Sequence, residues 1–210
     1  MKYAKDYFTN TSVKGKNEYS IYINKLNLLN IPLENKLICD VGCATGEFLE
    51  NVIKYNTCYG IDISAYAINQ CYKKFGRTKN KFFCLDLNYN EFNEDIKFDV
   101  ITMFDVIEHL NNFINLKRLI HKNLKKGGHV IVTTPNSNSL LRYISQNNFT
   151  GETDKTHVIL FTPYTLDFFL RKSGLSRIYL STPYGFYFKN NFITENLLFG
   201  GQIFAIYEKI

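Results

Sequence analysis

The hydrophobic residues of this chain alternate between short continuous runs and helical repeats. Residues 37–41 form an apolar run with the length and β-branching of a buried strand, and the chain breaks at Gly42 and Gly46 directly afterwards. Apolar residues then recur at helical spacing from Phe48 to Ile53. This order predicts a strand, a tight glycine loop and a helix, whose N-terminus presents unpaired backbone N–H groups to the loop.

The same alternation continues to the end of the chain. Further strands are predicted over residues 58–62, 81–85, 98–104, 129–133, 178–180 and 202–207. Helical repeats occur over residues 19–29, 65–75, 113–120 and 163–173. Ser64 is expected to cap the second helix, and Thr162-Pro163 starts the last one with proline at its first position. Alternating strands and helices pack as a parallel sheet with helices on both faces, so the sequence predicts an α/β fold.

Length and composition indicate a single domain over residues 1–210. The chain has 210 residues, of which 45% are hydrophobic, and this is enough for one substantial core. Three segments depart from the strand–helix rhythm. Residues 1–35 are predicted to form a helix packed on the edge of the sheet, and residues 135–162 and 182–200 are predicted to be insertions that close over a small substrate.

Charge and cysteine usage exclude several classes of protein. The net charge of +6 is spread out without a long basic run, which favours a solvated surface over a nucleic-acid footprint. No apolar run reaches the ~20 residues of a membrane helix, and the N-terminus lacks the apolar core of a signal peptide. The five cysteines include no Cys-x-x-Cys pair. We therefore expect a cytoplasmic protein with reduced core cysteines, no zinc site and no membrane span.

The glycine loop and the residues around it carry the first candidate chemistry. A dinucleotide site has a glycine in the middle of its loop, but this position is Ala44, which disfavours close approach of a pyrophosphate. Carboxylates stand at or just past the ends of four predicted strands: Asp40, Asp62, Asp86 and Asp105. Because ligands of open α/β sheets bind outside the carboxyl ends of the strands, four acids in register predict a binding site there.

Four motifs containing these acids resemble the successive motifs of class I S-adenosylmethionine-dependent methyltransferases. They are Asp40-Val-Gly-Cys-Ala-Thr-Gly46, Gly60-Ile-Asp-Ile-Ser64, Cys84-Leu-Asp-Leu87 and the segment 98–110, and they stand in the order and spacing of that family. The resemblance is closest to small-molecule O-methyltransferases of ubiquinone biosynthesis and to sugar methyltransferases. It implies a Rossmann-like, mostly parallel sheet of seven strands, with the last strand inserted antiparallel beside the fifth.

The resemblance also implies a cofactor and the residues that hold it. The cofactor is S-adenosyl-L-methionine, and the product is S-adenosyl-L-homocysteine. Each role falls on a matching position of this chain: Asp40, Gly42, Cys43, Ala44 and Gly46 around the methionine, Asp62 on the ribose, Ile63, Asp86 and Leu87 around the adenine, and Phe104, Asp105 and Val106 at the methionine end. Residues Tyr3 to Tyr7 are expected to serve as a lid over the cofactor.

Two histidines are candidates for the catalytic step, and His157 is the sharper candidate for a general base. His109 follows Asp105 at the mouth of the predicted site, and His157 stands in an Asp-x-x-His pattern that similar methyltransferases turn towards the substrate. Each histidine also has a purely structural interpretation. His109 would be a residue at a helix N-terminus, and His157 would cap the following helix or hold the insertion in place. Asp154 and His157 are also possible ligands of a divalent ion, but two ligands without a third predict no metal site.

The predicted reaction is methyl transfer to a small-molecule acceptor, foremost a hydroxyl of a sugar, a phospho-compound or another metabolite. Three alternatives stay open. The first is an RNA or protein methyltransferase, although the Asn/Asp-Pro-Pro-Tyr/Phe motif of base-methylating enzymes is absent after the fourth strand. The second is a non-catalytic cofactor-binding protein, and the third is a nicotinamide oxidoreductase, which Ala44 disfavours. The sequence leaves the acceptor and the oligomeric state undetermined.

Overall fold

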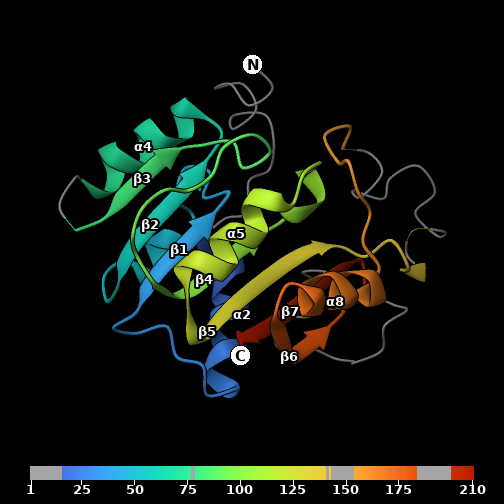
Figure 1. Cartoon of the computed structure of the whole chain (residues 1–210). Coiled ribbons are helices and arrows are strands. Elements are labelled where there is room, and N and C mark those ends of the chain that lie inside the picture. Colours follow the sequence, from blue (N-terminus) through green and yellow to red (C-terminus); the bar gives the residue numbers. More distant parts are fainter. Residues whose placement is uncertain (1–15, 77–78, 141, 143–153, 184–199) are drawn as a thin grey trace.

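A single seven-stranded sheet forms the centre of the molecule, with strand order β3-β2-β1-β4-β5-β7-β6 (Figure 1). The computed structural model describes residues 16–76, 79–140, 142, 154–183 and 200–210. The strands are β1 (Leu37–Val41), β2 (Thr57–Asp62), β3 (Lys81–Cys84), β4 (Phe98–Phe104), β5 (Leu124–Pro135), β6 (Leu175–Ser181) and β7 (Gln202–Lys209). Strands β1 to β5 are parallel, and β7 runs antiparallel to both β5 and β6. The predicted fold class and the antiparallel insertion of the last strand beside the fifth are confirmed.

Helices cover both faces of the sheet, as predicted. They are α2 (Lys16–Leu28), α3 (Leu49–Val52), α4 (Ala65–Phe75), the 3₁₀ turn η1 (Ile107–His109), α5 (Ile114–Asn123) and α8 (Pro163–Lys172). The apolar residues of α5 and α8 share one buried cluster, and those of α2, α3 and α4 share a second. The predicted caps are present, because Ser64 accepts a hydrogen bond from the Ala67 N–H and Thr162 accepts one from the Thr165 N–H.

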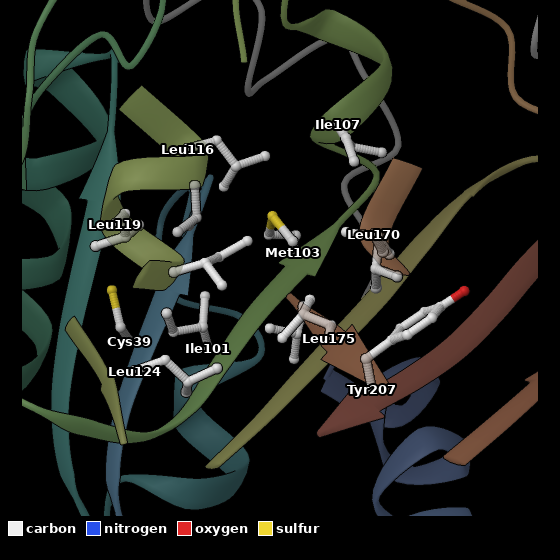
Figure 2. Packing of buried hydrophobic residues seen from close by; sticks show 14 of the residues in the cluster. Cys39, Ile101, Met103, Ile107, Leu116, Leu119, Leu124, Leu170, Leu175 and Tyr207 are labelled. Carbon is white, nitrogen blue, oxygen red and sulfur yellow. The ribbon is translucent and has the colours of Figure 1, made fainter. Parts of the chain in front are cut away.

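The side-chain alternation of the strands explains why there are two clusters. In β4, Ile101 and Met103 point to the face covered by α5, whereas Val100 belongs to the cluster on the opposite face. Figure 2 shows Met103 and Ile101 packed against Leu116 and Leu119 of α5. Strands that are buried on both faces require continuous apolar runs, which is the pattern that the sequence displays.

Two details differ from the prediction. Helix α2 packs on a face of the sheet, where the ring of Tyr22 contacts those of Phe104 and Phe204, and not at the sheet edge. Strand β5 begins at Leu124, five residues before the predicted start at His129. The additional residues stay in the sheet through an irregular pairing with β4. The proposed lid, Tyr3 to Tyr7, lies outside the described residues.

The sheet brings the predicted site residues to one edge. Asp40 lies opposite both Gly60 and Thr102 in the parallel ladders, and Asp62 lies opposite Cys84. The carboxyl ends of β1 to β5 therefore meet at a single edge, together with the start of the antiparallel β7. None of the helices in the described part of the chain combines the length and apolar content needed to cross a membrane.

Candidate active site

The glycine loop after β1 is a tight turn that glycine makes possible. Gly42 has a φ of +72°, and the N–H groups of Gly42 and Cys43 both donate to the carbonyl of Ile61. A Cβ atom at Gly42 would lie 2.2 Å from Cγ2 of Val106. The loop thus lies directly against the segment after β4, and any larger residue would push the two apart.

Asp62 stabilises this loop through its two carboxylate oxygens. Its Oδ2 accepts from the N–H of Ala44 at 2.9 Å, and its Oδ1 accepts from the N–H of Ser64 at 2.8 Å. Ala44 has a φ of +46°, a conformation that costs a non-glycine residue energy unless its surroundings hold it. Burial raises the pKa of Asp62, and these two backbone hydrogen bonds partly oppose that shift.

Asp40 is more deeply buried than Asp62. Its Oδ1 accepts from Thr102 Oγ1 at 2.6 Å, and only 3% of the residue is exposed. Burial raises the pKa of Asp40 to about 8, with a smaller contribution from the nearby charges of Glu47 and Asp62. Among the described residues, no lysine or arginine forms an ion pair with Asp40 or Asp62. The site therefore holds two buried acids that a cationic ligand would stabilise.

Asp105 joins the end of β4 to β5 and β7. It adopts a φ of +55°, and its Oδ1 accepts from Thr133 Oγ1 at 2.9 Å and from Gln202 Nε2 at 2.8 Å. Gln202 in turn accepts from the hydroxyl of Tyr22 at 2.6 Å. This chain of hydrogen bonds connects helix α2 to the edge of the sheet and fixes the direction of the Asp105 carboxylate.

The remaining predicted cofactor residues lie along the same edge. Ile63 is 44% exposed, as a side chain that packs on an adenine ring requires, and Asp86 is half-buried with its Oδ1 bonded to the Asn88 N–H. Phe104 packs its ring on Phe48 at 4.9 Å between centroids. Leu87 is buried in the core below the edge. Its contact with the cofactor, like the other individual site assignments, stays a prediction.

The two candidate histidines are brought together by backbone pairing across the mouth of the site. The carbonyl of Glu108, in η1, accepts from the N–H groups of both Val158 and Ile159. This pairing places the segment after residue 154 directly over η1. The rings of His109 and His157 consequently lie 4.7 Å apart between centroids, although 48 positions separate them in the sequence.

A hydrogen-bonded group of polar side chains surrounds these histidines. Thr156 Oγ1 lies 2.9 Å from His109 Nδ1 and 2.6 Å from Asp154 Oδ1. Nε2 of His157 lies 3.9 Å from carboxylate oxygens of both Glu108 and Asp154. Burial lowers the pKa of His109, a hydrogen bond with the backbone of Thr156 opposes that shift, and the neighbouring His157 lowers the pKa further.

A third potential metal ligand joins the histidines in the folded chain. Glu108, His109 and His157 each offer a ligand atom, and these atoms lie within 4.8 Å of one another. The sequence argument considered only Asp154 and His157 as a pair, and the fold supplies a different set of three. Three donors of this kind suit a divalent cation, so the expectation of a metal-free site stays a prediction that needs an experiment.

Several residues of this edge were not among the sequence candidates. They are Thr156, Gln202 and Thr102, which contact the predicted residues directly. The Asp154-Lys-Thr156 stretch contains a local signal only for the contact with Asp154, since a hydroxyl two residues after an acid can bond to it, whereas the contact with His109 has no such signal. Gln202 begins an antiparallel strand, and only the strand order brings it to Asp105.

The fold and the acid-lined glycine loop define an enzyme of the class I S-adenosylmethionine-dependent methyltransferase type. Residues 17–180 match a methyltransferase-domain family, and the chain belongs to that family. The match spans the glycine loop, the four acids and both histidines. The buried Asp40 and Asp62 carboxylates suit a cofactor that carries an ammonium group and a ribose diol, and S-adenosyl-L-methionine is the cofactor of this family.

Two curated relatives carry the same name. The chain is 26% identical over 169 residues to a ubiquinone biosynthesis O-methyltransferase of Hydrogenovibrio crunogenus, covering 73% of this chain and 70% of the relative. It is 30% identical over 118 residues to a ubiquinone biosynthesis O-methyltransferase of Pelagibacter ubique, covering 53% of this chain and 47% of the relative. The chain thus spans only about half the length of the second relative.

Solved structures share the fold at low sequence identity. An S-adenosylmethionine-dependent methyltransferase of Mesorhizobium loti superimposes with a TM-score of 0.69 at 17% identity, covering 89% of this chain and 96% of that one. One of Archaeoglobus fulgidus gives 0.67 at 22% identity, with 98% and 97% covered. The N-methyltransferase NodS of Bradyrhizobium japonicum gives 0.62 at 14% identity, with 93% and 98% covered. These likenesses show the fold and do not distinguish oxygen from nitrogen acceptors.

Proposed function

We propose that this enzyme transfers the methyl group of S-adenosylmethionine to a hydroxyl group of a small molecule. The histidine group formed by Glu108, His109 and His157 at the mouth of the site is the observation that supports this proposal. The cofactor supplies a methyl group on a sulfonium, which a correctly aligned nucleophile displaces in line. A neutral hydroxyl is a weak nucleophile and gains from a base beside it, whereas an amine needs no such help once it is deprotonated.

Each residue group has a separate task in this proposal. Asp40 and Asp62 bind the cofactor's ammonium group and ribose hydroxyls, and the loop that begins at Gly42 orients it. His109 accepts the proton of the acceptor hydroxyl as the methyl group transfers. His157 and Glu108 complete the wall on which the acceptor lies. Alignment of the two reactants and exclusion of water account for the rest of the rate enhancement.

An acceptor panel with S-adenosylhomocysteine as the readout tests the proposal. The panel contains dihydroxylated aromatics, sugars, phosphorylated hydroxy compounds, primary amines, a peptide and RNA. We expect turnover with a member of one of the three hydroxyl classes and none with RNA or peptide. Turnover confined to amines, peptide or RNA would contradict hydroxyl methylation, and binding of the cofactor without any turnover would favour the non-catalytic alternative.

The same assay decides whether the histidine group uses a metal ion. In the general-base mechanism, prior treatment with EDTA leaves the rate unchanged. A loss of rate that added Mg²⁺ or Zn²⁺ restores would assign Glu108, His109 and His157 to a cation, which would then lower the pKa of the acceptor hydroxyl directly. Cofactor binding, measured in parallel by calorimetry, is expected in the micromolar range, on the order of −8 kcal/mol, with or without EDTA.

Cofactor binding is expected to release a proton from Asp40. Its pKa of about 8 lies above the ordinary value of ~3.9, so at pH 6.5 the free protein holds Asp40 protonated. An ammonium group bound beside Asp40 favours its ionised carboxylate. The affinity for the cofactor therefore rises by up to ~10-fold per pH unit and levels off above pH ~8.

Calorimetry at pH 6.5 in two buffers of different ionisation enthalpy measures this proton release. Asp40→Asn keeps the acceptor for Thr102 and should abolish the release; equal heats in both buffers for the parent enzyme would contradict the prediction.

A further inference from the structure

The hydroxyl group of Thr156 lies between an acid and a histidine, and it has only one proton to donate. Its Oγ1 is 2.6 Å from Asp154 Oδ1 and 2.9 Å from His109 Nδ1, so both neighbours are within hydrogen-bond distance. The direction of each hydrogen bond is therefore coupled to the other. If the hydroxyl donates to one neighbour, it can only accept from the other.

The role of Asp154 as a hydrogen-bond acceptor decides that direction. An ionised carboxylate is an acceptor only, and Oδ1 also accepts the Thr156 N–H at 2.8 Å. The proton of the Thr156 hydroxyl therefore points to Asp154. Towards His109 the hydroxyl oxygen acts as an acceptor, and Nδ1 must carry the proton.

We infer that Thr156 is a positioning residue that holds His109 in the Nδ1–H tautomer, so that the lone pair of the ring is on Nε2. The relay runs from Asp154 through Thr156 to His109, and it places a hydroxyl where many catalytic histidines have a carboxylate. This inference rests on the proposed function only for its consequence, which is that the Nε2 atom of His109 receives the acceptor proton. The tautomer itself does not depend on a bound methyl acceptor.

Two contacts hold His109 in place. Its backbone N–H donates to the carbonyl of Val106, which fixes the main chain of η1, and Nδ1 of its ring lies 2.9 Å from the Thr156 hydroxyl. A ring that is held in one orientation and one tautomer presents the same unprotonated nitrogen, Nε2, as the base.

Nitrogen-15 NMR of the histidine rings tests the inference without any acceptor. The chain has four histidines, and His109→Asn identifies the signals of His109 by their disappearance. In the parent protein at neutral pH, we expect a protonated, pyrrole-type shift at Nδ1 of His109 and a pyridine-type shift at Nε2. Thr156→Val, which removes the hydroxyl and retains the side-chain shape, should convert the ring to a mixture of tautomers. Thr156→Ser restores a hydroxyl and should restore the parent spectrum.

The kinetic consequence follows the same series. Thr156→Val should lower the single-turnover rate of methyl transfer by ~10–100-fold, and Thr156→Ser should recover most of it. Cofactor affinity should not change in either variant. A parent spectrum with the proton on Nε2, or a tautomer unchanged in Thr156→Val, overturns the inference. A confirmed tautomer in an enzyme that methylates no hydroxyl would instead overturn the proposed function and leave the relay intact.

Discussion

Replacement of Asp62 by alanine is expected to weaken binding of S-adenosylmethionine by ~10²–10⁴-fold. The carboxylate is expected to accept two hydrogen bonds from the ribose hydroxyls, and hydrogen bonds to a charged group contribute ~1.5–3 kcal/mol each. Every ~1.4 kcal/mol changes the dissociation constant tenfold. Asp62 also accepts from the Ala44 and Ser64 N–H groups, so the loop that receives the cofactor loses its support in the same variant.

The structure adds a stability cost to this prediction. Loss of the two backbone hydrogen bonds should lower the free energy of unfolding by ~1–3 kcal/mol, because the Ala44 N–H helps to hold a left-handed conformation. Asp62→Asn is the matched control, since its amide oxygen can keep one backbone hydrogen bond while the negative charge is lost. Calorimetric titration and thermal unfolding separate the two effects. A folded Asp62→Ala variant that binds the cofactor with parental affinity would show that Asp62 is only a structural residue of the turn.

Replacement of His109 by asparagine is expected to lower the single-turnover rate of methyl transfer by ~10²–10⁴-fold at saturating cofactor and acceptor. The asparagine amide can occupy the place of Nδ1 and keep the contact with Thr156, so the variant removes little besides the base at Nε2. Single-turnover kinetics isolates the chemical step from binding and product release. Cofactor affinity and the melting temperature should stay close to those of the parent enzyme.

The pH dependence supports the same assignment. Burial lowers the pKa of His109. The ring therefore stays neutral at pH values below ~6.5, the ordinary pKa of histidine. The neutral ring is the active base, and the rate should therefore be constant above pH ~6.5 and fall only as the pH drops through the lowered pKa. His157→Asn is the control: an inflection should remain, moved to a higher pH because His157 contributes to lowering the pKa of His109. A His109→Asn variant with a parental rate would transfer the role to His157 or to alignment alone.

The hydrophobic pattern determined most of the architecture. Strands β1, β2 and β4 match the predicted runs closely, because strands buried on both faces need uninterrupted apolar residues and the sequence shows each run between turn residues. The caps at Ser64 and Thr162 were readable because capping depends on neighbours in the chain. The start of β5 was not readable, since the irregular pairing that keeps residues 124–128 in the sheet depends on the partner strand.

The candidate site also combines features that the sequence predicts with contacts that only the folded structure shows. The sequence by itself indicated the glycine loop and the four acids, because each acid lies at or just past the end of its own strand and the carboxyl ends of parallel strands meet at one edge of the sheet. Only the tertiary structure decided which side chains meet across the mouth of the site. The pairing of Glu108 with Val158 and Ile159 joins two distant segments, and it helps to bring Thr156 to His109 and Glu108 to His157. Contacts of this kind depend on strand order and loop docking, which have no local signature in the chain.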